Sequence, residues 1–172
     1  MKKKKLSARY LEKRKVPKVL IAGLIIASVL GWTGWSKLKE VKNYYQIKEI
    51  FPDKTRATDV LDGDTFVISN GLTLRLLGID APGRGEDNFD KSKDYLTFLV
   101  DDKELKLEYD NYQDDKFGRI LAYVWIPCMK AVIEYCRDDK ALVNEIMIKE
   151  GLATKIFYEK RKKLKYDEYL QR

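Results

Sequence analysis

The chain has 172 residues, with 34 lysine or arginine, 27 aspartate or glutamate and no histidine, and its formal net charge is +7. Residues 1–56 hold 15 basic and 4 acidic side chains, which leaves 19 basic and 23 acidic ones, a net charge of −4, for residues 57–172. The positive charge therefore belongs to the N-terminal part, which argues against a domain that binds polyanions through its overall field. With no histidine and two cysteines, the composition also excludes the usual four-ligand zinc site.

The N-terminal part has the features of a membrane anchor. A basic arm, residues 1–18, precedes an uncharged run at residues 19–36, close to the roughly 20 apolar residues that span a bilayer. Trp32 and Trp35 near the end of this run suit the membrane interface. We predict a single-pass helix of the cell membrane over residues 19–36, with the arm in the cytoplasm and the following domain extracytoplasmic. The alternatives are a cleaved signal peptide, which would give a secreted protein, and a buried helix of a soluble domain.

The rest of the chain predicts a linker and one folded domain. Residues 37–55 are polar and rich in lysine, and residues 56–172 are enough for one modest core. Asn70-Gly71 is a strong hairpin turn signal. Short β-rich runs on both sides of it and further along predict strands at 58–61, 65–69, 72–79, 103–109 and 118–126.

Two helices are predicted in the same domain. Apolar residues recur at helical spacing in residues 89–100 and again in residues 142–150, where Gly151 follows as a C-terminal cap. Strands in a block, a helix, two more strands and then helices are typical of an α+β fold built on a small barrel. Cys128 and Cys136 are a candidate disulfide if the domain lies outside the cytoplasm, and two free thiols if it lies inside.

Three motifs carry the candidate chemistry: Asp62-Gly63-Asp64-Thr65, Arg75-Leu76-Leu77-Gly78-Ile79-Asp80-Ala81-Pro82 and Asp115-Lys116-Phe117-Gly118-Arg119. Asp64 precedes a strand and Asp80 ends one that Pro82 prevents from continuing, so both carboxylates can meet at one end of a barrel. Their oxygens suit a hard cation such as calcium or magnesium. The guanidinium groups of Arg75 and Arg119 match two phosphate oxygens. Taken singly, these residues also fit an aspartate-stabilised turn, a solvating charge or a salt bridge to a nearby aspartate.

The order and spacing of these motifs resemble the thermonuclease (staphylococcal nuclease) family over roughly two thirds of the chain. The resemblance implies a small five-stranded OB-like β-barrel with about three helices, here preceded by the N-terminal transmembrane helix. It implies that Asp64, Asp80 and the backbone carbonyl of Ala81 bind Ca²⁺, with Mg²⁺ as the other candidate. It also implies that Arg75 and Arg119 bind the scissile phosphate and stabilise charge in the transition state.

One position departs from the family pattern. The residue after Pro82 is Gly83, where the family has a glutamate that activates the attacking water, and a glycine accepts no proton. Gly83 and Gly85 make the following segment pliable, so that Glu86 or its neighbour Asp87 can return towards the metal. Glu86 is the candidate general base; the alternative is that both acids only solvate a loop.

The resemblance also implies contacts with the substrate. Phe157 and Tyr158 lie about where the family places aromatic side chains that stack on bases, and Lys116 belongs to the third motif. Stacking would explain why the base sequence of the substrate matters little. The alternative for the two aromatic residues is packing of the last helix. Residues 127–140 have no clear family counterpart and are interpreted as an insertion near the barrel rim.

Three functions remain open on this basis. The first is a membrane-anchored, metal-dependent nuclease that cuts DNA and RNA, preferably single-stranded, with little sequence specificity. The second is a catalytically weakened or inactive OB-fold relative that binds nucleic acid. The third is an anchored scaffold for a protein partner. The acids and arginines together favour the first over the third, while Gly83 separates the first from the second.

Overall fold

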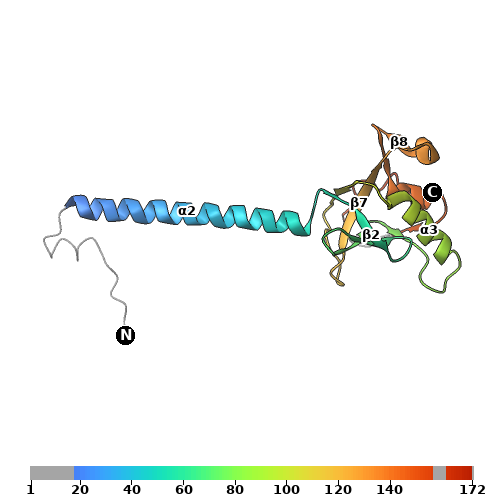
Figure 1. Ribbon diagram of the computed structural model, residues 1–172, viewed down its shortest axis with the longest axis horizontal. Coiled ribbons are helices and arrows are strands. Elements are labelled where there is room, and N and C mark those ends of the chain that lie inside the picture. Colours follow the sequence, from blue (N-terminus) through green and yellow to red (C-terminus); the bar gives the residue numbers. More distant parts are fainter. Residues whose placement is uncertain (1–17, 157–161, 172) are drawn as a thin grey trace. The chain divides into compact units, whose positions relative to one another are not determined.

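The computed structural model describes residues 18–156 and 162–171, and within the first helix it describes the side chains of residues 31, 33–44 and 46–50. The chain divides into two compact units, Met1–Ile47 and Lys48–Arg172. Figure 1 shows helix α2, in blue to teal, which makes up all of the described part of the first unit. The predicted basic arm lies almost wholly outside the described residues.

Helix α2, Lys18–Ile50, is continuous over 33 residues and includes most of the predicted linker. No glycine or proline follows Gly34 until Pro52, which explains why the helix continues to Ile50. Among the residues whose side chains are described, no helix is both long enough and apolar enough to cross a membrane. Most of the predicted anchor, residues 19–36, lies outside that set, so the anchor stays a prediction.

The second unit is built on an eight-stranded mixed sheet, in which six strands follow the order β1-β6-β7-β4-β3-β2. The other two extend it: β9 pairs with β7, and β8 pairs with β9. Its strands are β1 Lys54–Thr55, β2 Ala57–Val60, β3 Thr65–Ile68, β4 Thr73–Leu76, β6 Leu105–Glu108, β7 Ile120–Pro127, β8 Cys136–Arg137 and β9 Lys140–Leu142. Among these described strands, only β4 and β7 pair in parallel. A separate pair joins β5, Ile79–Asp80, to β10, Thr154–Lys155. The five predicted strands are confirmed, although the run 72–79 divides into β4 and β5.

The β3–β4 hairpin sets the register on which the candidate site depends. At the predicted turn, Gly71 has a φ of 81°, and Asn70 Oδ1 accepts a hydrogen bond from the Leu72 amide at 3.1 Å. Glycine adopts this left-handed backbone without a steric penalty, as a tight hairpin requires. The turn pairs Thr65 with Arg75 across the two strands.

Two α-helices and one 3₁₀ helix occur in the described part of this unit: α3 Phe89–Val100, α4 Val143–Lys149 and η1 Lys130–Tyr135. Helix α3 packs against β2 and α4, and α4 packs against β7. Gly151, with a φ of 70°, follows α4, and its amide donates to the Ile148 carbonyl at 3.0 Å, as expected for a C-terminal cap. The α+β class is therefore confirmed, and the core includes Phe66, Leu74, Leu99, Tyr123 and Ile146.

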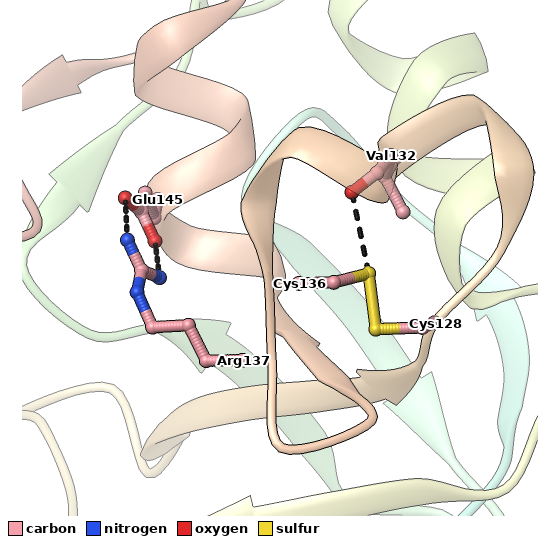
Figure 2. The surroundings of a disulfide bond; sticks show 5 residues. All are labelled: Cys128, Val132, Cys136, Arg137 and Glu145. Carbon is pink, nitrogen blue, oxygen red and sulfur yellow. Dashed lines mark hydrogen bonds and ion pairs between the residues drawn. A yellow bond between two sulfur atoms is a disulfide. The ribbon is translucent and has the colours of Figure 1, made fainter.

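Residues 127–140, the predicted insertion, run from the last residue of β7 through η1 and β8 to the first residue of β9, which pairs with β7. Figure 2 shows the disulfide between Cys128 and Cys136, which closes this segment, with Cα atoms 5.8 Å apart. Beside it, Arg137 donates to both carboxylate oxygens of Glu145 on α4, at 2.5 and 2.9 Å. Since the Glu145 side chain is only 4% exposed, this bidentate pair ties the insertion firmly to α4.

Candidate active site

Asp64 ends a tight turn that leads into β3. Its amide donates to Asp62 Oδ1 at 3.0 Å, so Asp62 stabilises the turn as turn aspartates generally do. Gly63 has a different role, because an added Cβ would lie 1.8 Å from Ser92 Oγ and 2.8 Å from Ala81 Cβ. Helix α3 and the chain after β5 therefore approach the turn too closely for any side chain at position 63.

We expect Gly63→Ala to lower the free energy of unfolding by about 1–3 kcal/mol, because the new methyl group overlaps atoms of the packed helix α3. Denaturant unfolding of the full chain measures the change. Adding Ser92→Gly should restore part of the loss, since it removes both Ser92 atoms within 3 Å of the new Cβ. Equal stability of Gly63→Ala and the wild type would contradict this account of the turn.

Asp64, Arg75 and Asp80 form one cluster of ion pairs. Arg75 Nη1 lies 2.5 Å from Asp64 Oδ1, and Arg75 Nη2 pairs with Asp80 Oδ1. Arg75 Nη2 also reaches the carbonyl oxygen of Ile79 at 3.4 Å. The side chains of Asp64, Arg75 and Asp80 are 2, 16 and 60% exposed. The structure thus brings three predicted site residues together, with Asp64 innermost and Asp80 open to solvent.

Burial governs the electrostatics of this cluster. It raises the pKa of the Asp64 carboxyl to about 6, against the opposing effects of Arg75 and of hydrogen bonds from Thr65 and the Ala81 amide. Burial also disfavours the charge of Arg75, but Asp64 and Asp80 outweigh it, so the pKa of Arg75 lies above its ordinary value. At neutral pH Asp64 and Arg75 are therefore mainly charged.

The groups that could hold a metal are the carboxylates of Asp64 and Asp80 and the backbone carbonyl of Ala81. In the part of the chain that the structure describes, no three acidic, histidine or cysteine side chains converge as a metal site. Both carboxylates, however, form ion pairs with the guanidinium of Arg75, so an oxygen of each already faces the same positive charge. Such an oxygen donor set fits a hard cation that completes its shell with water or phosphate.

Arg119 lies beside the cluster, just before the neighbouring strand. Strands β4 and β7 run parallel with Arg75 opposite Leu121, and Arg119 precedes Leu121 by two residues, about 7 Å along the chain. Its Nε donates to Asp115 Oδ2 at 2.7 Å, and its side chain is 27% exposed. The salt bridge to Asp115 is therefore formed, and the guanidinium is still accessible from solvent.

The predicted substrate contacts are only partly described. Lys116 is exposed beside Phe117, with its Nζ 4.9 Å from the centre of the phenyl ring. Phe117 is 71% exposed, and Arg119 also lies over its ring, with Cζ 5.4 Å from the ring centre, so an exposed aromatic side chain and two cations lie together here. Phe157 and Tyr158 lie outside the described residues.

Glu86 folds back onto Gly83. The Gly83 amide donates to Glu86 Oε2 at 2.7 Å, and the Glu86 amide donates to the Gly83 carbonyl at 2.9 Å. A Cβ added at Gly83 would lie 3.7 Å from both Cδ and Oε2 of Glu86, so the carboxylate lies next to the space that a side chain at position 83 would enter. Asp87 is exposed. A pocket of about 190 Å³ lies here, lined by Asp80, Ala81, Pro82, Glu86, Gly151, Leu152, Ala153 and Thr154.

Two residues of the site were not predicted. Thr65 donates its hydroxyl to Asp64 Oδ1 at 2.6 Å, and its position directly after Asp64 in the first motif was the available signal. Thr154 pairs with Asp80 across β10 and β5, and its hydroxyl donates to the Asp80 carbonyl at 3.3 Å. A contact made by a two-residue strand 74 positions away leaves no local pattern in the sequence.

Fold and site together define an α+β domain with an acid and arginine cluster at one end of a mixed sheet. The family described as "Staphylococcal nuclease homologue" matches residues 73–172. The chain belongs to this family, and the mixed sheet with few helices is the OB-like fold that the resemblance implied.

Curated relatives agree with this assignment. The chain is 33% identical over 125 residues to the thermonuclease of Staphylococcus hyicus, covering 65% of this chain and 63% of that protein. It is 34% identical over 101 residues to an uncharacterized endonuclease of Escherichia coli, covering 57% of this chain and 58% of that protein. It is 37% identical over 107 residues to endonuclease YncB of Bacillus subtilis (strain 168), covering 54% of this chain and 43% of that protein. The matched region thus spans less than two thirds of each of these relatives.

Proposed function

We propose that this protein is a metal-dependent nuclease that hydrolyses phosphodiester bonds of DNA and RNA with little sequence specificity. The observation that carries the proposal is the cluster in which Arg75 joins Asp64 to Asp80, with Arg119 directly before the adjoining strand β7. The names of the relatives, thermonuclease and endonuclease, support the same reaction class. Single-stranded substrate is the preferred form, because exposed Phe117 can stack on an unpaired base.

Asp64, Asp80 and the carbonyl of Ala81 would hold the cation, Ca²⁺ in the first instance and Mg²⁺ as the alternative. When bound, the cation polarises the phosphate and offsets the charge that develops on it. Arg75 and Arg119 bind the phosphate oxygens through their planar forks and stabilise that charge further. The parallel β4–β7 pair places Arg75 opposite Leu121, two residues after Arg119, so both arginines come from neighbouring backbone segments.

Glu86 is proposed as the general base. Its Oε2 is held by the Gly83 amide, while among the described residues Oε1 accepts no hydrogen bond, so Oε1 can take a proton from an attacking water. Glu86, Asp80 and Ala81 line the same pocket, which has room for such a water next to two of the proposed metal ligands. The bond between the Gly83 amide and Oε2 orients the carboxylate.

The proposed function is tested by cleavage of a labelled single-stranded oligonucleotide by the full chain, with calcium, with magnesium and with chelator. We expect cutting with calcium that the chelator abolishes. Binding without cutting would instead support the second function, an inactive OB-fold nucleic-acid-binding protein, which Gly83 at the family's glutamate position favours. Neither binding nor cutting would contradict both and leave the scaffold function.

Residues 19–36 are proposed to anchor the protein in the cell membrane with the domain outside the cytoplasm. The uncharged run with its basic N-terminal flank supports this topology, and the Cys128–Cys136 disulfide suits an oxidising compartment. Protease added to intact cells that express the chain should degrade the domain and spare an N-terminal cytoplasmic tag. Release of the domain into the medium would favour the secreted alternative, and protection of the domain would contradict both.

A further inference from the structure

Arg75 is the shared partner of the two carboxylates proposed to bind the metal. One guanidinium nitrogen, Nη1, pairs with Asp64 Oδ1 at 2.5 Å, and the other, Nη2, pairs with Asp80 Oδ1. The guanidinium is thus placed between the two acids and uses both prongs of its fork on them. The same fork is what the proposed reaction needs for phosphate.

The oxygens of Asp64 have little capacity left. Oδ1 accepts from Thr65 Oγ1 at 2.6 Å as well as from Arg75, and Oδ2 accepts from the Ala81 amide at 2.9 Å. A carboxylate offers about four acceptor positions, so three of them are taken. One position on Asp64 Oδ2 remains, and among the described residues Asp80 Oδ2 accepts no hydrogen bond. A cation that binds both acids through these oxygens lies next to the Arg75 guanidinium, and two positive groups so close repel each other.

Arg75 nevertheless stabilises the site when no metal is bound. Asp64 is 2% exposed, and a buried carboxylate without a cationic partner is strongly destabilising. Asp80 is 60% exposed, so its pair with Arg75 is the weaker one and the easier to break.

We propose that Arg75 is the counter-ion of the metal-free site, that a divalent cation displaces its guanidinium from the two carboxylates, and that displacement makes the fork available to phosphate. The proposal rests on the proposed metal site and goes beyond it. It makes cation and phosphate binding mutually favourable, since each ligand is helped by the rearrangement that the other causes.

The test is calcium titration of the full chain by calorimetry, without nucleic acid, for the wild type, Arg75→Gln and Arg56→Gln. Removing the competing charge should make Arg75→Gln bind Ca²⁺ at least about threefold tighter. Arg56→Gln is the control, because Arg56 pairs with the exposed Asp102 and with neither carboxylate of the cluster, and its affinity should equal that of the wild type. Equal or weaker calcium binding by Arg75→Gln would overturn the proposal.

Arg75→Lys keeps the experiment decisive if Arg75→Gln fails to fold. A lysine ammonium keeps the charge but lacks the fork that holds both acids, so its calcium affinity should lie above that of the wild type. An affinity equal to or below that of the wild type overturns the proposal in that case. If neither the wild type nor any variant binds calcium, the metal site is overturned and this inference with it. If the wild type binds calcium but the Arg75 variants bind it no more tightly, the inference alone is overturned.

Discussion

Asp64→Asn is expected to reduce metal-dependent cleavage to below about 1% of the wild-type rate, because the metal contributes several kcal/mol to transition-state stabilisation. The asparagine would keep the volume of the side chain and one oxygen for the Thr65 hydroxyl, but it removes the negative charge that a divalent cation requires. The position is 1% exposed and lies beside Arg75, and the substitution leaves Asp80 as the one carboxylate of the cluster. Initial rates with the labelled oligonucleotide at saturating calcium measure the effect.

Asp62→Asn is the matched control for this prediction. Asp62 belongs to the same turn, yet its described role is to accept the Asp64 amide through Oδ1, and an asparagine provides the same acceptor. Its rate should stay within about threefold of the wild type, as for a substitution that preserves a hydrogen bond. A similar loss in both variants would mean that the turn, rather than the Asp64 charge, limits activity. Asp64→Asn activity within the same threefold range would exclude Asp64 as a metal ligand.

The fold was predictable where the sequence carries local signals. Asn70-Gly71 identified the hairpin, and Gly151 the end of α4, because positive φ values favour glycine at those points. The break between β4 and β5 was missed, since Gly78 lies within an apolar run that reads as one strand. Strands β1, β8 and β10 were missed for another reason: each has two residues and exists only through its partner strand.

The site was predictable to a similar extent. The hairpin register, with Thr65 opposite Arg75, brings the backbone of Asp64 close to β4 once the turn is known. The contact between the Asp64 and Arg75 side chains does not follow from the register, because neighbouring residues of a strand point to opposite faces. The need for glycine at position 63 was not predictable, because it depends on how closely Ser92 of α3 approaches. The sequence offered two acids after Gly83, Glu86 and Asp87, and only the folded loop distinguishes them, through the hydrogen bond from the Gly83 amide to Glu86.

Glu86→Gln is expected to lower the turnover rate by about 10²-fold, within the range typical of general-base catalysis, and to leave calcium affinity unchanged. Glutamine keeps an oxygen that can accept from the Gly83 amide, so the loop should retain its structure while the proton acceptor is lost. Asp87→Asn, the same change at the exposed neighbouring acid, should have little effect. The reverse result, a large loss with Asp87→Asn and none with Glu86→Gln, would assign the base to Asp87.

A second substitution separates loss of the base from damage to the loop. Gly83 is not among the residues with positive φ, and an added Cβ there meets nothing closer than 3.7 Å, so a side chain is sterically acceptable. Gly83→Glu in the Glu86→Gln background should be at least about tenfold faster than Glu86→Gln alone, because it supplies a carboxylate to the same pocket. Gly83→Gln in that background, with the same shape and no base, should recover none. Equal rates for the two double variants would show that the pocket needs no carboxylate from this loop.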